Sequence, residues 1–261
     1  MEFATKPQLA NKMIERAVTA RLPFAWVAGD EVHGDNGPLR TWLEAQHIAY
    51  VLAVACHHRV PAGAGRALRA DELAARLPRR AWQRLPAGAG AKGQRWYDWA
   101  WITINDDAPG YRHLLIRRNR STGELAFYRC HSTHPVTLAA LVKVAGLRWT
   151  IEENFQAGKG LTGLDEHQVR RWTSWYRWVT LTMLAAAVLT IATALEHDRS
   201  PAREELIPLT RNEVAHLLAS TIIRPASGTA HRMHWSHWRR RHQHRARTCH
   251  YQRQSAQEQG T

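Results

Sequence analysis

The first 55 residues of the chain alternate between helical and strand-like patterns of apolar positions. Residues 6–22 place apolar side chains on one side of a helix, and 36–47 show the same period behind Asn36, a residue type that caps helix N-termini. Residues 24–30 and 48–55 are short, almost continuous apolar runs, which are typical of buried strands. Short connections between a strand, a helix and a second strand predict a parallel α/β sheet.

The pattern changes after residue 56. Residues 57–131 begin with a stretch rich in Ala, Arg, Gly and Pro, which contains a short predicted helix at 70–76 and a glycine-rich run at 86–95 that we expect to be mobile. Three strand candidates, separated by turn sequences, follow at 96–105, 111–119 and 124–131. We therefore predict a β-rich antiparallel insertion over 57–131.

From residue 136 onward the pattern is mostly helical. The helical period predicts helices over 136–158, 166–196 and 210–223. The end of the chain is rich in His and Arg over 231–253, and we expect 254–261 to be disordered. The predicted organisation is a core part over 1–56, the insertion over 57–131, helices over 132–224, and a basic, partly disordered tail over 225–261.

One apolar segment has to be distinguished from a membrane span. Residues 178–195, WVTLTMLAAAVLTIATAL, carry no charge over roughly 18 residues, about the minimum length of a transmembrane helix. The segment is rich in Ala and Thr, and it continues a charged helical pattern that starts at Arg170. These features favour a buried core helix over a membrane anchor, so we expect no membrane partner.

The charge of the chain indicates a polyanionic partner, most simply nucleic acid. The formal net charge of the 261 residues is +14, and 31 of the 36 basic residues are arginine. Arginine binds phosphate with two parallel donors and stacks on aromatic rings. A GC-rich genome would also raise the arginine content without a functional reason, and a basic soluble protein is the plain alternative.

The three cysteines, Cys56, Cys130 and Cys249, are widely spaced and form no C-x-x-C pair. This spacing argues against a disulfide framework or a zinc ribbon and favours a reducing compartment. The N-terminus lacks the charged-then-apolar pattern of a signal peptide. We therefore expect a cytoplasmic protein.

The stretch RWTIEENFQAGKG, residues 148–160, contains two adjacent acids between cations. On a helix, Arg148, Glu152 and Lys159 fall in one narrow stripe beside an apolar stripe. Glu152 would then lie at the edge of the buried face, whereas Glu153 would point to solvent. Taken alone, the stretch is better explained as a salt-bridged helix that ends at its two glycines.

A second acid, Asp30, follows the first predicted strand. The C-terminal ends of parallel strands are where α/β sheets place their sites, although a helix cap or a turn residue is the simpler alternative. Together, Asp30 and Glu152 indicate metal-assisted phosphoryl chemistry, because two Mg²⁺ or Mn²⁺ ions about 4 Å apart need carboxylates from separate elements. Arg148 and Lys159 would then hold phosphates.

The spacing around Glu152 resembles the Y-R-E-K signature of bacterial insertion-sequence transposases with a ribonuclease-H-like DDE core. That signature has an arginine four residues before the catalytic glutamate and a lysine seven after it. Arg148 and Lys159 satisfy both spacings, and Ala145 stands where the signature has tyrosine. Three further segments are similar to one branch, the DDE superfamily endonucleases of insertion elements: WVAGDEVHGDNGPLRTWLEAQHIAYVLAV, GAKGQRWYDWAW and GLDEHQVRRWTSWYRWVTLTMLAAAVL.

This resemblance covers about residues 3–195 and implies a ribonuclease-H-like α/β core with a β-rich insertion and a C-terminal helical region. The implied activity is transposition, in which insertion-element ends are cut and joined by two-metal phosphoryl transfer with Mg²⁺ or Mn²⁺. Asp30 would be the second catalytic acid and Glu152 the third. Arg148 and Lys159 would contact the double-stranded DNA of the terminal repeats and the target. The protein would act at the nucleoid, and homodimer formation is left open.

The first catalytic aspartate of this family has no counterpart in the predicted elements. It should lie on a strand upstream of TKPQLANKM, and only Glu2 and Glu15 precede Asp30 as carboxylates. We therefore expect an N-terminally truncated transposase with impaired catalysis. A noncatalytic DNA-binding remnant is the alternative, so whether the chain is an enzyme stays open.

Further DNA contacts are predicted outside the signature. In the basic tail we expect Arg239, Arg240 and Arg241 to bind DNA without sequence specificity, and Arg171 is a candidate in RRWTSWYRW. The tail histidines follow no zinc-ligand spacing. Core packing explains the tryptophans of residues 170–178 better than stacking on bases does.

Overall fold

The computed structural model describes residues 3–63, 65–90, 93–104, 109–168, 170–199, 206–222 and 228–259. The chain forms two compact units, Met1–Thr150 and Ile151–Thr261. Each unit is described separately below. The boundary between them falls within one continuous helix, α5 (Leu138–Thr162).

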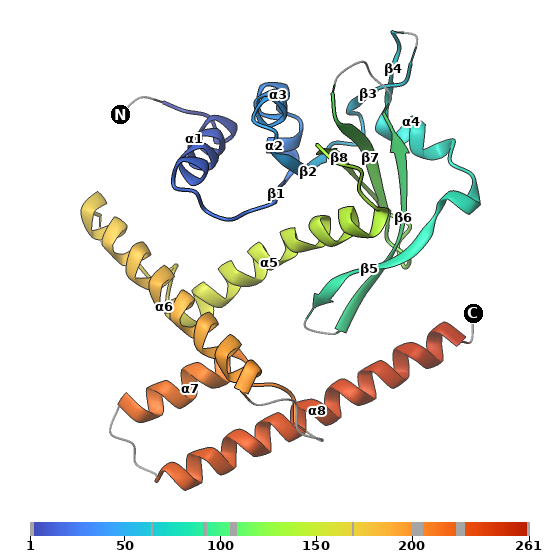
Figure 1. Cartoon of the computed structure of the whole chain (residues 1–261). Coiled ribbons are helices and arrows are strands. Elements are labelled where there is room, and N and C mark those ends of the chain that lie inside the picture. The colour runs from blue at the N-terminus through green and yellow to red at the C-terminus, as the bar shows by residue number, and fades with distance from the viewer. Residues whose placement is uncertain are drawn as a thin grey trace. The chain divides into compact units, whose positions relative to one another are not determined.

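The first unit is a mixed α/β structure (Figure 1). Its helices before α5 are α1 (Lys6–Thr19), α2 (Glu31–Gly34), α3 (Gly37–Ala45), α4 (Ala70–Ala75) and the 3-10 helix η1 (Arg79–Ala81). Its strands are β1 (Trp26–Gly29), β2 (Ala49–Val54), β3 (Arg59–Pro61), β4 (Ala67–Arg69), β5 (Gln83–Gly90), β6 (Gly93–Thr103), β7 (Tyr111–Arg118) and β8 (Leu125–Ser132).

The predicted strand–helix–strand arrangement is confirmed. β1 and β2 pair in parallel, with Trp26 opposite Ala49 and Gly29 opposite Leu52. The predicted cap at Asn36 is also present, because its side chain accepts a hydrogen bond of 2.8 Å from the backbone N–H of Leu39. The helical and strand periods of the first 55 residues therefore predicted this part of the fold correctly.

The predicted insertion is antiparallel, but it does not form a sheet of its own. The main sheet has the order β1-β2-β8-β7-β6-β5, and β8 pairs antiparallel with β2 through pairs such as Tyr50 with His131. Residues 57–131 therefore extend the sheet that β1 and β2 begin. Among the described strands, the short β3–β4 pair lies outside this sheet.

The prediction that the glycine-rich run at 86–95 is mobile is wrong for its described residues. Its described residues belong to β5 and β6, which pair antiparallel with Leu85 opposite Tyr97 and with a register shift between Pro86 and Ala89. Pairing with the aromatic strand β6 orders a segment whose own composition does not favour a strand. Residues 91 and 92 lie outside the described residues.

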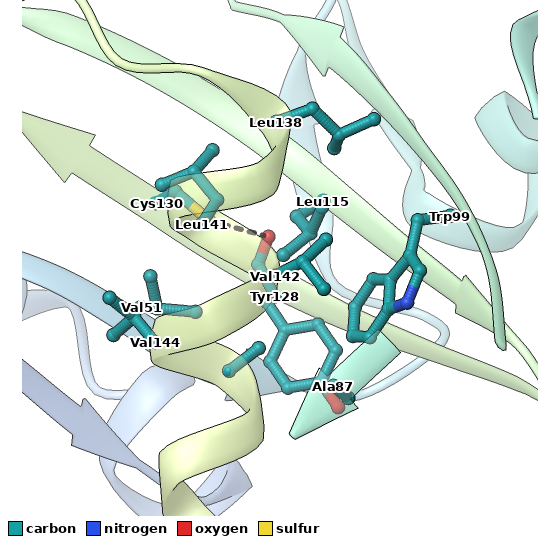
Figure 2. Close-up of a cluster of buried hydrophobic side chains, with 11 residues drawn as sticks. Val51, Ala87, Trp99, Leu115, Tyr128, Cys130, Leu138, Leu141, Val142 and Val144 are labelled. Carbon is teal, nitrogen blue, oxygen red and sulfur yellow. Dashed lines mark hydrogen bonds between the residues drawn. The ribbon is translucent and has the colours of Figure 1, made fainter. Parts of the chain in front are cut away.

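The main core of the first unit lies between α5 and one face of the sheet, as Figure 2 shows. Its buried side chains from α5 are Leu138, Leu141, Val142, Val144 and Ala145, and those from the sheet are Val51, Ala87, Trp99, Leu115, Tyr128 and Cys130. The opposite face of the sheet packs against Ala70 and Ala74 of α4, while Leu39 and Leu43 of α3 cover Tyr50 and Leu52. These contacts fix the first half of α5 across the sheet.

The second unit is helical. After the end of α5 it contains α6 (Trp172–Arg199), α7 (Arg211–Ile222) and α8 (Thr229–Gln259). The three helices predicted from residue 136 onward are thus confirmed. The prediction that 254–261 are disordered is wrong for residues 254–259, because α8 continues to Gln259. Residues 260–261 lie outside the described residues.

The prediction that residues 178–195 form a buried core helix is also wrong. They belong to α6, and only 17 % of its most apolar 18-residue window is buried. Among the described residues, α6 is the one helix long and apolar enough to cross a membrane by length and composition. Apolar composition predicted burial here, but the described structure leaves most of that surface exposed.

Candidate functional site

Asp30 lies where the sequence placed it, directly after β1. It occupies the N-cap position of α2, but its side chain makes no capping hydrogen bond to the backbone. Instead, Oδ1 forms a 2.6 Å hydrogen bond with Nδ1 of His33, and the side chain is 43 % exposed. The helix-cap alternative therefore describes the position of Asp30 but not the interaction of its carboxylate.

The environment of Asp30 favours the ionised carboxylate. Burial raises the pKa of Asp30, but the hydrogen bond and charge of His33 and the charge of Arg148 lower it by more, so the pKa lies below its ordinary value. Arg148 comes from α5, which begins more than a hundred residues after Asp30. The structure thus brings two separately predicted candidates into one electrostatic environment.

Close packing of α5 on β5 places Arg148 there. A Cβ atom on Gly146 would lie 2.0 Å from the carbonyl oxygen of Ala87, so the helix can approach this strand only at a glycine. Arg95 connects the same elements, since its Nη2 donates to the carbonyl oxygens of Ala87 (2.8 Å) and Gly146 (3.1 Å). Its guanidinium also lies 5.4 Å from the ring centroid of Trp149.

The structure shows why a tyrosine would not fit at residue 145, the position where the resembled signature has one. Ala145 is buried in the core between α5 and the sheet, where a larger side chain would have to displace its neighbours. The charge of Arg148 also acts on a tyrosine of another element. Burial raises the pKa of Tyr128 on β8, and the charges of Arg117 and Arg148 lower it in part.

The signature helix is confirmed as a helix, although its details differ from the prediction. Arg148, Glu152 and Lys159 all lie within α5, so their spacing places them on one stripe. The predicted burial of the two acids is reversed, because Glu152 is exposed and Glu153 is half-buried. Glu152 and Lys159 belong to the second unit, and their proposed roles stay predictions.

The end of α5 was also predicted at the wrong glycines. The helix continues through Gly158 and Gly160 to Thr162, and the chain turns at Gly163, which has φ of 68°. The carbonyl oxygen of Gly158 accepts a hydrogen bond of 3.1 Å from the N–H of Leu164. The left-handed backbone at Gly163, not the mere presence of glycine, ends the helix.

Of the four further arginines predicted to contact DNA, two bind acceptors of the protein itself and two are exposed. Arg239 forms a two-pronged ion pair with Glu213 of α7, with N–O distances of 2.7 and 3.0 Å, and Nε of Arg240 donates to the carbonyl oxygen of Ile207 at 2.9 Å. Burial raises the pKa of Glu213, but the hydrogen bonds and the charge of Arg239 lower it by more. Arg241 and Arg171 are exposed and have no such structural contact among the described interactions.

The two predicted metal ligands belong to different units, Asp30 to the first and Glu152 to the second, so each is described by itself. Within the described parts of the chain there is no cluster of three or more His, Cys, Asp and Glu side chains that could hold a metal ion. Asp30 pairs with His33, and the nearby Asp35 pairs with His58 at 2.7 Å. Each of these two carboxylates therefore hydrogen-bonds a histidine, and that of Asp35 also accepts from the backbone N–H of Ala55 at 3.3 Å.

Sequence reasoning missed His33 and Arg95. His33 follows Asp30 by three residues, a spacing at which a side chain on a short helix can return to the N-cap residue, so this signal was present in the sequence. Arg95 has no comparable local signal, because its contacts to Ala87, Gly146 and Trp149 depend on how α5 packs. In comparisons with known proteins, no protein-family model and no curated protein matches this chain.

Proposed function

We propose that this protein is a DNA-binding protein of the DDE-transposase kind, and that β1, β2 and α5 belong to a ribonuclease-H-like core. The observation that carries the proposal is the position of Asp30 directly after β1, the strand that pairs in parallel with β2, while the charge of Arg148 on α5 makes the smallest of the contributions that lower the pKa of Asp30. Arginines beside an acid at the end of a parallel strand suit the binding of a phosphodiester.

Double-stranded DNA is the proposed partner. The net charge of +14 and the excess of arginine favour a polyphosphate. Arg148 and Lys159 on α5 and the exposed Arg171 and Arg241 are the proposed phosphate contacts. Arg239 and Arg240 serve first to connect α8 with α7 and with the segment at Ile207, because their guanidinium groups bind acceptors of the protein itself.

Asp30 and Glu152 are the acids that the chain would contribute to Mg²⁺- or Mn²⁺-dependent strand cleavage, and they belong to different units. We therefore derive no catalytic step for the chain alone. The second candidate is a noncatalytic DNA-binding protein derived from a transposase, and the engagement of the Asp30 carboxylate by His33 favours it.

One pair of assays tests the proposal. Binding to a fluorescent random-sequence DNA duplex is measured over a range of salt concentrations, and nicking of supercoiled plasmid and of the DNA that flanks the gene is measured with Mg²⁺ or Mn²⁺. We expect binding that weakens steeply with salt. Any nicking should disappear in Asp30→Ala and Glu152→Ala and persist in Glu153→Ala, the matched control on α5.

The results separate the two candidates and can contradict both. Salt-dependent binding without nicking under either metal leaves the noncatalytic function. Nicking that survives both Asp30→Ala and Glu152→Ala contradicts the assigned acids. The absence of DNA binding at low salt by the folded protein contradicts the proposal as a whole.

A further inference from the structure

The sheet of the first unit contains a buried arginine that no described residue pairs with. Arg129 lies near the middle of β8 and is only 7 % exposed. Its Nε is buried without a hydrogen-bond partner, and none of the described residues accepts a hydrogen bond from its guanidinium. Because an unpaired charge is costly to bury, a guanidinium in this position indicates a ligand that supplies the acceptor.

The strand register places Arg129 beneath the helices α2 and α3. Arg129 pairs with Leu52 of β2, so the two side chains lie on the same face of the sheet, and Leu52 packs there against α3. The end of α2 lies over the same part of β2, because a Cβ atom on Gly34 would lie 1.8 Å from the carbonyl oxygen of Ala53. The guanidinium is therefore buried on the face of the sheet opposite to α5.

Two further polar groups lie in this region. Nη1 of Arg40 on α3 donates to the carbonyl oxygen of Gly34, which leaves its other N–H groups for a ligand. His58 forms a 2.7 Å hydrogen bond with Asp35 through Nδ1, and its Nε2 is buried without a partner. Burial and the charges of Arg40 and Arg129 lower the pKa of His58 by more than Asp35 raises it, so the ring is neutral at neutral pH.

The carboxylates beside this cluster are already engaged by other groups. Glu44 forms an ion pair with Arg112 at 2.6 Å and accepts a hydrogen bond from the hydroxyl of Tyr50 at 2.7 Å. Asp35 accepts from His58 and from a backbone N–H. Three guanidinium groups, including that of Arg112, stand against these two carboxylates. The cluster therefore has an excess of positive charge that a bound anion would balance.

The donors and acceptors of the cluster select the kind of anion. A carboxylate such as Asp35 can only accept, so the proton of neutral His58 is on Nδ1 and its Nε2 presents a lone pair. Guanidinium groups present donors only. Phosphate suits both, because its charged oxygens accept from arginine while its remaining P–O–H group donates to Nε2. Sulfate and phosphodiesters carry no such proton at neutral pH.

We propose that Arg129, Arg40 and His58 bind inorganic phosphate or a phosphate monoester. This inference goes beyond the proposed function and does not depend on it, because a DNA backbone consists of diesters and Arg129 is too deeply buried for a duplex to reach. The bound phosphate would supply the acceptor that the buried guanidinium lacks and the donor that Nε2 of His58 lacks. It would also balance the excess positive charge.

Isothermal titration calorimetry of the full-length protein with inorganic phosphate and with sulfate, at matched ionic strength and neutral pH, tests the site. We expect phosphate to bind at least about tenfold more tightly, because sulfate leaves Nε2 of His58 without a donor. Arg129→Met should abolish binding without lowering the melting temperature in phosphate-free buffer, because it removes an unpaired buried charge. Arg117→Met is the matched control, since that guanidinium lies over Tyr97 on the other face of the sheet, and it should bind phosphate like wild type.

A second variant tests the selectivity for phosphate. His58→Phe keeps a ring at this position and removes Nε2, so it should bind phosphate no more tightly than sulfate. Retention of the full preference for phosphate in this variant would contradict the role of His58.

Competition identifies the source of the phosphate group. A short oligonucleotide with a 5′-phosphate displaces inorganic phosphate if the site accepts monoesters and does not displace it if the site accepts only the free ion. The proposal holds in either case. Displacement by the same oligonucleotide without its terminal phosphate would overturn the proposal, because only diesters remain.

Three further results would overturn the proposal. They are the absence of phosphate binding by the folded wild-type protein, equal wild-type affinities for phosphate and sulfate, and equal losses of binding in Arg129→Met and Arg117→Met. Far-UV circular dichroism confirms the fold of each variant.

Discussion

The guanidinium of Arg148 on α5 lowers the pKa of Asp30 at the end of β1, although the two residues are near opposite ends of the first unit's sequence. His33 contributes more to this effect, because it forms a direct 2.6 Å hydrogen bond with the carboxylate. Packing of α5 through Gly146 on Ala87 makes the long-range part possible. An acid and a basic helix that the sequence separates thus share one electrostatic environment.

The ionisation of Asp30 gives the first prediction. Both His33→Ala and Arg148→Gln should raise the pKa of Asp30, and His33→Ala should raise it more, because the hydrogen bond outweighs the distant charge. Carbonyl-detected NMR titration of the side chain measures both values. A larger effect of Arg148→Gln, or none from either variant, would contradict the described contacts.

The same shift has a defined effect on stability. Because the pKa of Asp30 is lower in the folded state, its contribution is present above the unfolded-state value of about 3.9 and is lost as the pH falls through the folded value. The stability difference between wild type and His33→Ala should therefore be larger at neutral pH than in acid. Urea unfolding at several pH values measures this difference.

Two glycines of α5 should respond oppositely to alanine. Gly146→Ala should destabilise the protein by about 1–3 kcal/mol, because the new methyl group would overlap the carbonyl of Ala87. Gly160→Ala meets no neighbouring atom and should stabilise the helix by about 0.5–1 kcal/mol. Thermal unfolding of both variants gives the comparison. Equal effects would show that α5 does not approach β5 as described.

Most strands of the main sheet, but not β5, could be predicted from the sequence alone. The apolar periods predicted β1, β2 and the strands β6 to β8, because each has an apolar pattern and turn residues of its own. Strand β5 was missed, since its Gly-, Ala- and Pro-rich sequence becomes a strand only by pairing with β6 and packing under α5. Its order depends on contacts that no local pattern records.

For the candidate site, too, the sequence predicted the local structure but not the burial of the side chains. The spacing of Arg148, Glu152 and Lys159 correctly predicted a continuous helix, but not which acid would be exposed, because burial depends on what the helix packs against. Apolar composition similarly predicted a buried α6, which the structure contradicts. His33 was recognisable only after the short α2 placed its ring beside Asp30.

The buried ion pair between Arg112 and Glu44 should matter more than an exposed one. Nη2 of Arg112 lies 2.6 Å from Oε2 of Glu44, and the hydroxyl of Tyr50 donates to Oε1 at 2.7 Å. Arg112→Met should cost about 3 kcal/mol, because it leaves the Glu44 carboxylate without its cation. The exposed pair of Arg69 and Asp71 is the control, and Arg69→Met should cause no measurable change.

Acid should reduce the cost of Arg112→Met. Burial raises the pKa of Glu44, but the hydrogen bonds from Arg112 and Tyr50 lower it by more, so the pair stabilises the fold above the ordinary Glu pKa of about 4.3. This contribution is lost as the pH falls through the folded value. Chemical unfolding across that range measures it, and a cost independent of pH would contradict the charged pair.

Neighbouring arginines of α8 should have different roles. Arg239→Ala should lower the thermal stability of the second unit, because it breaks the ion pair with the nearly buried Glu213. Arg241→Ala should leave stability unchanged and weaken DNA binding at low salt, because its exposed side chain is available to phosphate. Calorimetry and fluorescence anisotropy test the two effects. The reverse assignment would contradict the placement of α8.

The most direct test of the central claim compares two lysines of α5. Lys159 lies on the stripe with Arg148 and Glu152, whereas Lys143 is exposed on another side of the helix, and each loses one charge on substitution by alanine. The measurement is the affinity for a DNA duplex as a function of salt. We expect Lys159→Ala to weaken binding and to reduce the slope of log K against log salt by about one, and Lys143→Ala to match wild type. Equal behaviour of the two variants would contradict a DNA-binding stripe on α5.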